Sequence, residues 1–262
     1  MRVETRGIRA YAYTGTRALV PARRTVVFIH GAANDHSVWV LQSRYFAHHG
    51  FNVLAVDLPG HGRSACSALH SITDLSAWLV DFLGAAQVSK ATLVGHSMGS
   101  LVALETAAQH PDRVEKIAMV GSAVPMPVSA TLLETSHAND HTAYEIINVF
   151  SHSATAQFGG NRVPGAWMMG ASMRLMERSA PGALHADFTA CNSYSTGLEQ
   201  AAKVSCPVLL VVGSKDQMTP ARAAGALASK LAHCTTRTLE GAGHALMSER
   251  PDALLDALIE FV

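Results

Sequence analysis

The chain has 262 residues, of which 48% are hydrophobic, and its 20 basic and 20 acidic side chains give a formal net charge of zero. This length suits one large α/β domain or a domain with an insertion, and it provides enough apolar sequence for a stable core. A balanced charge without a basic stripe argues against nucleic acid or an anionic membrane as the main partner.

The N-terminal residues 1–7 are polar and lack the apolar segment of an export signal. No apolar run reaches the roughly 18 residues that a membrane span requires. The four cysteines, Cys66, Cys191, Cys206 and Cys234, are far apart and match no metal-ligand spacing. We therefore expect a cytoplasmic protein with reduced thiols, no metal site and no cofactor, and the oligomeric state stays open.

Strand-like and helix-like patterns alternate along the chain. The segment Ile8–Tyr13 suggests an opening edge strand, and the apolar runs Thr25–Ile29 and Asn52–Val56 fit strands buried on both faces. Apolar residues at helical spacing, such as Leu75, Trp78, Leu79 and Phe82, predict a helix after them. Further strands are predicted at Thr92–Val94, Arg113–Val120, Pro207–Gly213 and about Thr235–Leu239, and a final helix is predicted from Pro251.

This alternation predicts an α/β fold with right-handed crossovers and a mostly parallel open sheet that helices cover on both faces. The alternation of strand and helix patterns stops at about Val124 and resumes after about Val204, with no buried strand pattern between them. We therefore predict a core made of residues 1–123 and 204–262. Residues 124–203 are expected to form a helical cap inserted after the sixth core strand.

The segment Gly95-His96-Ser97-Met98-Gly99 joins a predicted strand directly to a predicted helix. Glycine two residues before and two after Ser97 allows the sharp turn that lifts a serine side chain above the strand ends. The pattern alone is common, but this context is the one in which such a serine acts as a nucleophile. The alternative is a glycine-flanked serine in an ordinary β-to-α turn.

A serine nucleophile needs a base within reach and an acid that orients the base. His244 follows the last predicted strand and is the candidate base, with a surface-loop histidine as the alternative. Asp216 follows the strand that ends at Gly213, and the chain order serine, acid, histidine favours it as the acid. It could instead be a turn or helix-capping residue. Asp187 is a weaker candidate because no strand end holds it.

Acyl transfer also needs N–H donors that stabilise the oxyanion. The N–H of Met98, at the start of the helix after Ser97, is one candidate. The N–H of Ala32, in the loop after Thr25–Ile29, is the other. His30 is expected to support this loop rather than to take part in the chemistry.

Together, His30-Gly31, Asp57–Ser64, Gly95–Gly99, Gly213–Asp216 and Gly243-His244 resemble the α/β-hydrolase superfamily, and more narrowly its cap-bearing bacterial esterases. The resemblance implies a triad of Ser97, Asp216 and His244, with Ala32 and Met98 as oxyanion donors and residues 57–64 as a structural loop. Epoxide hydrolases and haloalkane dehalogenases carry aspartate at the position of Ser97, so their chemistries are not expected.

Within the predicted cap, Trp167 precedes Met169, Met173 and Met176, which share one helix face. This stripe could roof an apolar substrate pocket, or it could pack the cap onto the core. No cluster of arginine or lysine lines the expected site, so a strongly anionic substrate is not indicated.

The sequence thus favours a serine hydrolase that forms an acyl-enzyme with small to medium, largely apolar esters. The same triad could serve a lactonase, a thioesterase, an amidase or a carbon–carbon bond hydrolase of the meta-cleavage type. A ligand receptor on a hydrolase scaffold is the alternative from another class. The acyl length and the leaving group stay open.

Overall fold

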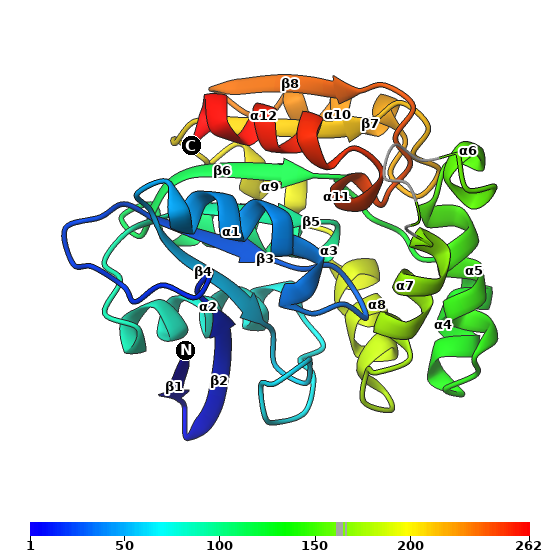
Figure 1. The fold of residues 1–262 in the computed structure, drawn as a ribbon, viewed down its shortest axis with the longest axis horizontal. Helices are drawn as coiled ribbons and strands as arrows, with labels where there is room; N and C mark the ends of the chain where they lie inside the picture. Colours follow the sequence, from blue (N-terminus) through cyan, green and yellow to red (C-terminus); the bar gives the residue numbers. More distant parts are fainter. Residues whose placement is uncertain (161–164, 166) are drawn as a thin grey trace.

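The computed structural model describes residues 1–160, 165 and 167–262. At its centre lies an eight-stranded sheet in the order β1-β2-β4-β3-β5-β6-β7-β8 (Figure 1). β2 pairs antiparallel with β1 and β4, and all other neighbouring strands are parallel. The strands are β1 Arg2–Thr5, β2 Ile8–Tyr13, β3 Thr25–Ile29, β4 Asn52–Asp57, β5 Ala91–His96, β6 Val114–Val120, β7 Val208–Gly213 and β8 Cys234–Leu239.

Each face of the sheet carries its own apolar cluster. Because successive strand residues point to opposite faces, Val27 and Ile29 contribute to one cluster, and Val26 and Phe28 contribute to the other. Helices α2 (Ile72–Ala85), α3 (Met98–Gln109) and α10 (Ala221–Ala228) cover the first face. The 3-10 helix η1 (His36–Trp39) and the helices α1 (Val40–His48), α11 (Leu246–Glu249) and α12 (Pro251–Phe261) cover the second. The α/β class and the mostly parallel sheet are therefore confirmed.

The N-terminal hairpin corrects the predicted position of the edge strand. Ile8–Tyr13 is a strand, but β1 pairs outside it, with Thr5 opposite Ile8. The two connecting residues, Arg6 and Gly7, both have positive φ angles, of 51° and 71°. This is the conformation of a two-residue hairpin turn, which allows a short, polar β1 to form the edge of the sheet.

Between β6 and β7 the chain leaves the sheet and forms a helical insertion, as the sequence predicts. Helices α4 to α8 gather beyond the carboxyl ends of the parallel strands, on the right of Figure 1, whereas α9 packs against α3 of the core. The limits of the cap, residues 124–203, remain a prediction. The helices are α4 Ala130–His137, α5 Thr142–Ser151, α6 Ala154–Gln157, α7 Met168–Met176, α8 Ala183–Ser193 and α9 Gly197–Ala201.

None of the helices in the described part of the chain combines the length and the apolar composition needed to cross a membrane.

Candidate active site

Ser97 occupies the tight turn between β5 and α3. Its φ and ψ angles of 51° and −119° lie outside the common regions for residues with a side chain. A Cβ atom at Gly95 would lie 2.1 Å from the carbonyl oxygen of Gly99, and one at Gly99 would lie 2.5 Å from the carbonyl oxygens of Ile29 and His30. The turn therefore requires both glycines, because backbone fills the space that a side chain would need.

Asp216 and His244 come from the loops after β7 and β8 and are in direct contact. Nδ1 of His244 lies 2.8 Å from Oδ2 of Asp216, and both side chains are buried. The carboxylate also accepts hydrogen bonds from the N–H groups of Met218 and Thr219 and from the Thr219 hydroxyl. Burial alone would raise the pKa of Asp216, but His244 and Thr219 together hold it below its usual value. Asp216 is therefore ionised at neutral pH and orients the His244 ring through the proton on Nδ1.

His96 links the serine turn to the histidine loop. Its Nε2 lies 2.9 Å from the carbonyl oxygen of His244. Burial, assisted by the nearby His244, lowers the pKa of His96 to about 3, so the ring is neutral and its Nε2–H donates to that carbonyl. This role could not be predicted from the sequence, because the residue before the serine carries no signal of a partner 148 positions away.

Ala32 lies in the loop after β3, and Gly31 approaches Ser97 so closely that a Cβ atom on it would lie 3.1 Å from the Ser97 Cβ. The carbonyl oxygen of Gly31 accepts hydrogen bonds from Nδ1 of His30 at 2.8 Å and from the N–H of Asn34 at 3.3 Å. The N–H and C=O of a trans peptide point in opposite directions, so the N–H of Ala32 is directed away from these two donors. Ala32 itself is among the residues that line the cavity described below.

The other candidate donor, Met98, has a side chain buried in the core. Met98 is the first residue of α3, so its N–H has no acceptor within the helix. His30 supports the loop as expected: its Nε2 accepts a hydrogen bond from the N–H of Leu58 at 3.1 Å. Burial, followed by the proximity of His61, lowers the pKa of His30 to about 4, which keeps the ring neutral in this role.

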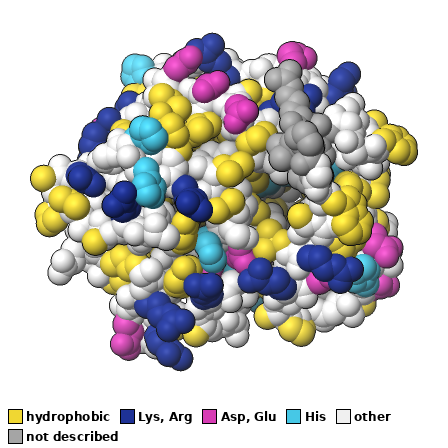
Figure 2. Space-filling model, viewed as in Figure 1, with side chains coloured by type: hydrophobic (Ala, Val, Ile, Leu, Met, Phe, Trp, Pro, Cys, Tyr) yellow, Lys and Arg dark blue, Asp and Glu magenta, His cyan; other side chains and the backbone are white. Residues whose placement is uncertain are grey.

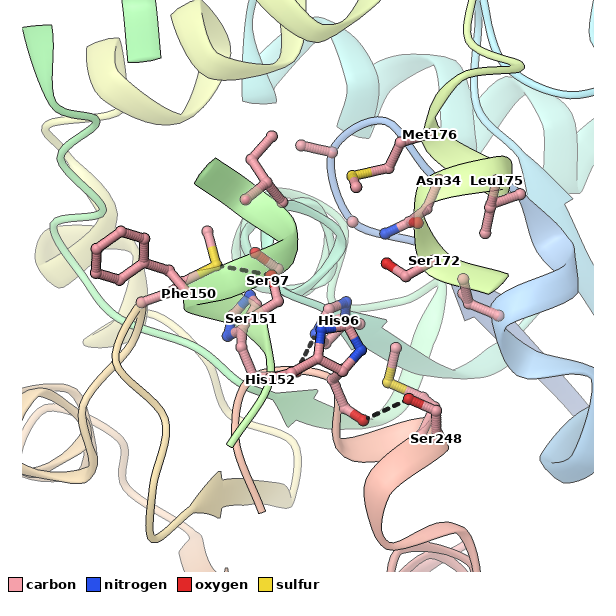
Figure 3. Close-up of a pocket in the computed structure, with 18 of the residues that line it drawn as sticks. Asn34, His96, Ser97, Phe150, Ser151, His152, Ser172, Leu175, Met176 and Ser248 are labelled. Atoms are coloured by element: carbon pink, nitrogen blue, oxygen red, sulfur yellow. Dashed lines mark hydrogen bonds between the residues drawn. The ribbon is translucent and has the colours of Figure 1, made fainter. Parts of the chain in front are cut away.

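A cavity of about 870 Å³ lies between these loops and the insertion, and both Ser97 and His244 line it. Figure 3 shows Ser97 and His96 on one side and residues of α7 opposite them. The insertion contributes mainly apolar walls, which suit an apolar substrate group. These wall residues include Val128, Leu132, Ile146, Ile147, Phe150 and Leu175.

The four residues predicted to form a pocket divide into two pairs. Trp167 and Met176 line the cavity, and Trp167 is 76% exposed. Met169 and Met173 do not line the cavity, and the prediction is wrong for them. Met173 instead packs against an apolar cluster that the insertion forms with Ala33 of the core, and Met176 belongs to this cluster. This agrees with the alternative that the stripe packs the cap onto the core.

The reason for this error is the rotation of α7 about its axis. The helix turns Met168, Ser172 and Leu175 toward the cavity, a face displaced by one residue from the predicted stripe (Figure 3). Methionine occurs on both faces, so the helical period could be predicted, but the side that faces the substrate could not.

Two arginines also line the cavity, contrary to the sequence-based expectation. Arg174 pairs with Glu177 at 2.6 Å, and Arg178 approaches Asp35 at 3.5 Å. Each charge is thus balanced by a neighbouring carboxylate. On the face shown in Figure 2, basic side chains lie among apolar, acidic and histidine side chains.

One group of side chains has the composition of a metal site. Asp35, His36 and Asp57 offer ligand atoms within 4.8 Å of one another. Asp57 Oδ1 already accepts a hydrogen bond from the N–H of His36 and lies 2.7 Å from its Nδ1. Asp35 Oδ1 accepts a hydrogen bond from the N–H of Ser37. We interpret the group as a hydrogen-bond network that ties the start of η1 to the end of β4.

The weaker candidate acid, Asp187, lies on α8 and does not take the place of Asp216 beside His244. Its Oδ2 accepts a hydrogen bond from the N–H of Ala33 at 2.9 Å and lies 3.0 Å from Nε2 of His61. Asp187 therefore contacts the loop that carries Ala32.

Comparisons with known proteins agree with this architecture. Residues 26–257 match the sequence model of the Alpha/beta hydrolase family. The chain is 30% identical over 255 residues to a non-heme chloroperoxidase of Streptomyces lividans, an alignment that covers 90% of this chain and 91% of that protein.

Two of the similar solved structures illustrate the match over the whole chain. The enol-lactonase from Burkholderia xenovorans has a TM-score of 0.88 at 19% identity, covering 100% of this chain and 99% of that one. An esterase from Exiguobacterium antarcticum has a TM-score of 0.85 at 17% identity, covering 100% and 98%. With the sequence match over most of its length, the chain belongs to the alpha/beta hydrolase family.

Proposed function

We propose that this protein is a serine hydrolase that cleaves carboxylic esters through an acyl-enzyme, with Ser97 as nucleophile, His244 as general base and Asp216 as the orienting acid. The observation that carries the proposal is the 2.8 Å contact between Asp216 and His244 beside the cavity that Ser97 lines. The strained turn at Ser97 supports it, because strain of this kind concentrates at functional sites.

In the proposed reaction, Oγ of Ser97 attacks the ester carbonyl carbon while Nε2 of His244 accepts the hydroxyl proton. The carbonyl oxygen gains negative charge and is stabilised by the N–H groups of Ala32 and Met98. The intermediate collapses as the carbon–oxygen bond of the leaving group breaks, and His244 gives its proton to the departing alcohol. Water, activated by the same histidine, then releases the acid and restores Ser97.

The cavity supports an ester with an apolar group of medium length. Its volume of about 870 Å³ and the apolar walls of α4, α5 and α7 suit such a group. Arg174 and Arg178 are each paired with a carboxylate, so the substrate itself is not required to carry a negative charge.

A rate panel tests the substrate class. It compares p-nitrophenyl acetate, butyrate and octanoate with a lactone, a thioester and an anilide. An ester hydrolase turns over the p-nitrophenyl esters repeatedly and prefers them to the other three. A preference for the lactone, thioester or anilide would replace the ester assignment, and a single slow turnover of every compound would favour a ligand receptor.

Two variants test the triad. Ser97→Ala should lower kcat by about 10⁴-fold or more and abolish labelling by a fluorophosphonate, whereas the exposed Ser229→Ala should be labelled like the wild type. Asp216→Asn should lower kcat by about 10⁴-fold, because an amide cannot stabilise the imidazolium of His244. Labelling that persists in Ser97→Ala would overturn the assignment.

A further inference from the structure

The insertion holds both backbone groups of Ala33, the residue that follows the proposed oxyanion donor. The N–H of Ala33 donates to Oδ2 of Asp187 on α8 at 2.9 Å. The hydroxyl of Ser179, between α7 and α8, donates to the carbonyl oxygen of Ala33 at 3.2 Å. Ala33 is buried and has a φ angle of 53°, a conformation that needs such external support in a residue with a side chain.

A buried cation fixes Asp187. His61 Nε2 lies 3.0 Å from Oδ2 of Asp187, and its Nδ1 lies 3.0 Å from the carbonyl oxygen of Pro59. Both partners are acceptors, so both contacts are hydrogen bonds only when both ring nitrogens carry protons. The side chains of His61 and Asp187 are each 1% exposed. An ion pair so well shielded from water and salt holds the carboxylate in one place.

These contacts fix two successive peptide groups around Ala32. The peptide between Gly31 and Ala32 is held through its carbonyl oxygen by His30 and Asn34. The next peptide, between Ala32 and Ala33, is held through its N–H by Asp187. The N–H of Ala32 belongs to the first of these peptides, so Asp187 acts on it indirectly. With the second peptide held, the φ and ψ angles of Ala32 are restricted and the first plane is no longer free to rotate.

We propose that Asp187 is a positioning residue, which aligns the N–H of Ala32 for the oxyanion through its hydrogen bond to the N–H of Ala33. The inference rests on the proposed function, in which Ala32 supplies an oxyanion donor. It assigns to α8 of the insertion a part in transition-state stabilisation besides its part in covering the cavity. Asp187 itself is absent from the lining of the cavity and acts through Ala33.

A purely structural anchor would have different consequences. Loss of an anchor lowers thermal stability and changes substrate and transition-state binding alike. If instead the N–H of Ala32 loses its alignment, kcat falls with little change in KM, because the oxyanion forms only in the transition state. The two roles are therefore separable by kinetics and by the affinity for a tetrahedral inhibitor.

The experiment compares three variants. Asp187→Asn keeps an oxygen acceptor for the N–H of Ala33. The double variant Asp187→Leu with His61→Leu removes the acceptor together with the cation, so that no unpaired charge stays buried. Tyr194→Phe is the matched control, because it removes a buried hydrogen bond from the end of α8 to Glu105 of the core, 2.6 Å long, without touching the loop of Ala32.

Tyr194→Phe should keep kcat within about threefold of the wild type. Asp187→Asn, which keeps an acceptor but loses the ion pair to His61, should have a kcat between those of Tyr194→Phe and the double leucine variant. The double leucine variant should lose at least about 10-fold in kcat with KM almost unchanged, since complete removal of an oxyanion donor costs about 100- to 1000-fold. Its inhibition constant for an alkylboronic acid, which forms a tetrahedral adduct with serine, should rise in parallel, and that for the carboxylic acid product should not. If the double variant does not fold, Asp187→Glu, which moves the carboxylate by one methylene, should show the same pattern.

Wild-type kcat in the double leucine variant would overturn the inference, as would equal losses in Asp187→Asn or Tyr194→Phe. A rise in KM alone would also overturn it. Failure of the proposed function is distinguishable, because turnover would then survive in Ser97→Ala whatever happens at Asp187.

Discussion

The Nε2 of His96 and the carbonyl oxygen of His244 lie 2.9 Å apart, which connects the turn of Ser97 to the loop of the proposed base. His96→Phe removes the Nε2–H donor to the His244 carbonyl. It should lower kcat by about 10- to 100-fold, because a displaced His244 accepts the proton of Ser97 less efficiently. His96→Gln retains an N–H donor and should recover most of that loss. The measurement is kcat at neutral pH, and equal activity in His96→Phe and the wild type would contradict the positioning role.

Gly99→Ala should prevent formation of the serine turn. The added Cβ would lie 2.5 Å from two backbone oxygens, and neither can move without displacing β3. We expect a loss of at least about 3 kcal/mol in the free energy of unfolding, together with loss of activity. Gly225→Ala is the control, since a Cβ atom there meets no other atom within 4 Å inside α10. It should stabilise the protein by about 0.5–1 kcal/mol, and equal behaviour of the two variants would refute the steric argument.

Substitutions on the two faces of α7 should separate packing from specificity. Met173 packs in the insertion, so Met173→Ala should lower thermal stability and change kcat/KM by a similar factor for all esters. Leu175 lines the cavity, so Leu175→Ala should reduce kcat/KM for octanoate more than for acetate. A buried methylene contributes about 0.8 kcal/mol, or roughly fourfold in rate. The measurement is kcat/KM for acetate, butyrate and octanoate esters in both variants. A shifted chain-length preference in Met173→Ala would contradict the packing role of Met173.

The His61–Asp187 pair should make stability depend on pH. Burial alone would lower the pKa of His61, but the Asp187 carboxylate raises it above the ordinary value of 6.5. A raised pKa means that folded His61 keeps its proton after the unfolded chain has lost it. The contribution of the pair is therefore fully present below about pH 6.5 and is lost as the pH rises through the folded pKa.

Urea unfolding from pH 6.5 to 9 measures this effect in the wild type and in the double variant His61→Leu with Asp187→Leu. The difference between their free energies of unfolding should fall as the pH rises, by up to about 1.4 kcal/mol per pH unit. A difference that is constant or increases over this range would show that His61 is not the titrating group.

Local patterns explain why much of the candidate site could be predicted from the sequence. The serine turn depends on Gly95 and Gly99, which lie within two residues of Ser97. Asp216 and His244 each follow a strand, and the carboxyl ends of parallel strands meet at one edge of a sheet. Strand patterns, together with the chain order serine, acid, histidine, therefore brought forward two residues that the structure places 2.8 Å apart.

Contacts between distant segments explain what could not be predicted. The hydrogen bond from Ala33 to Asp187 spans 154 positions, and Asp187 stands in a helix with no motif around it. The cavity-facing side of α7 depends on how the helix docks, because apolar residues occupy more than one of its faces. The β1 hairpin was missed because its strand is polar and its turn, Arg6-Gly7, gives only a weak signal.

The insertion begins after β6 and ends before β7, and these strands are neighbours in the sheet. Because the two strands are parallel, the chain leaves the sheet at its carboxyl edge and enters β7 at the opposite edge, after α9 has packed against α3. A different set of helices in place of α4 to α8 would leave the order of the strands unchanged. Such an exchange would replace the cavity walls, and with them the substrate specificity, on an unchanged hydrolase core. On the proposal made for Asp187, the new helices would also have to carry an acceptor that meets the N–H of Ala33 where Asp187 now meets it.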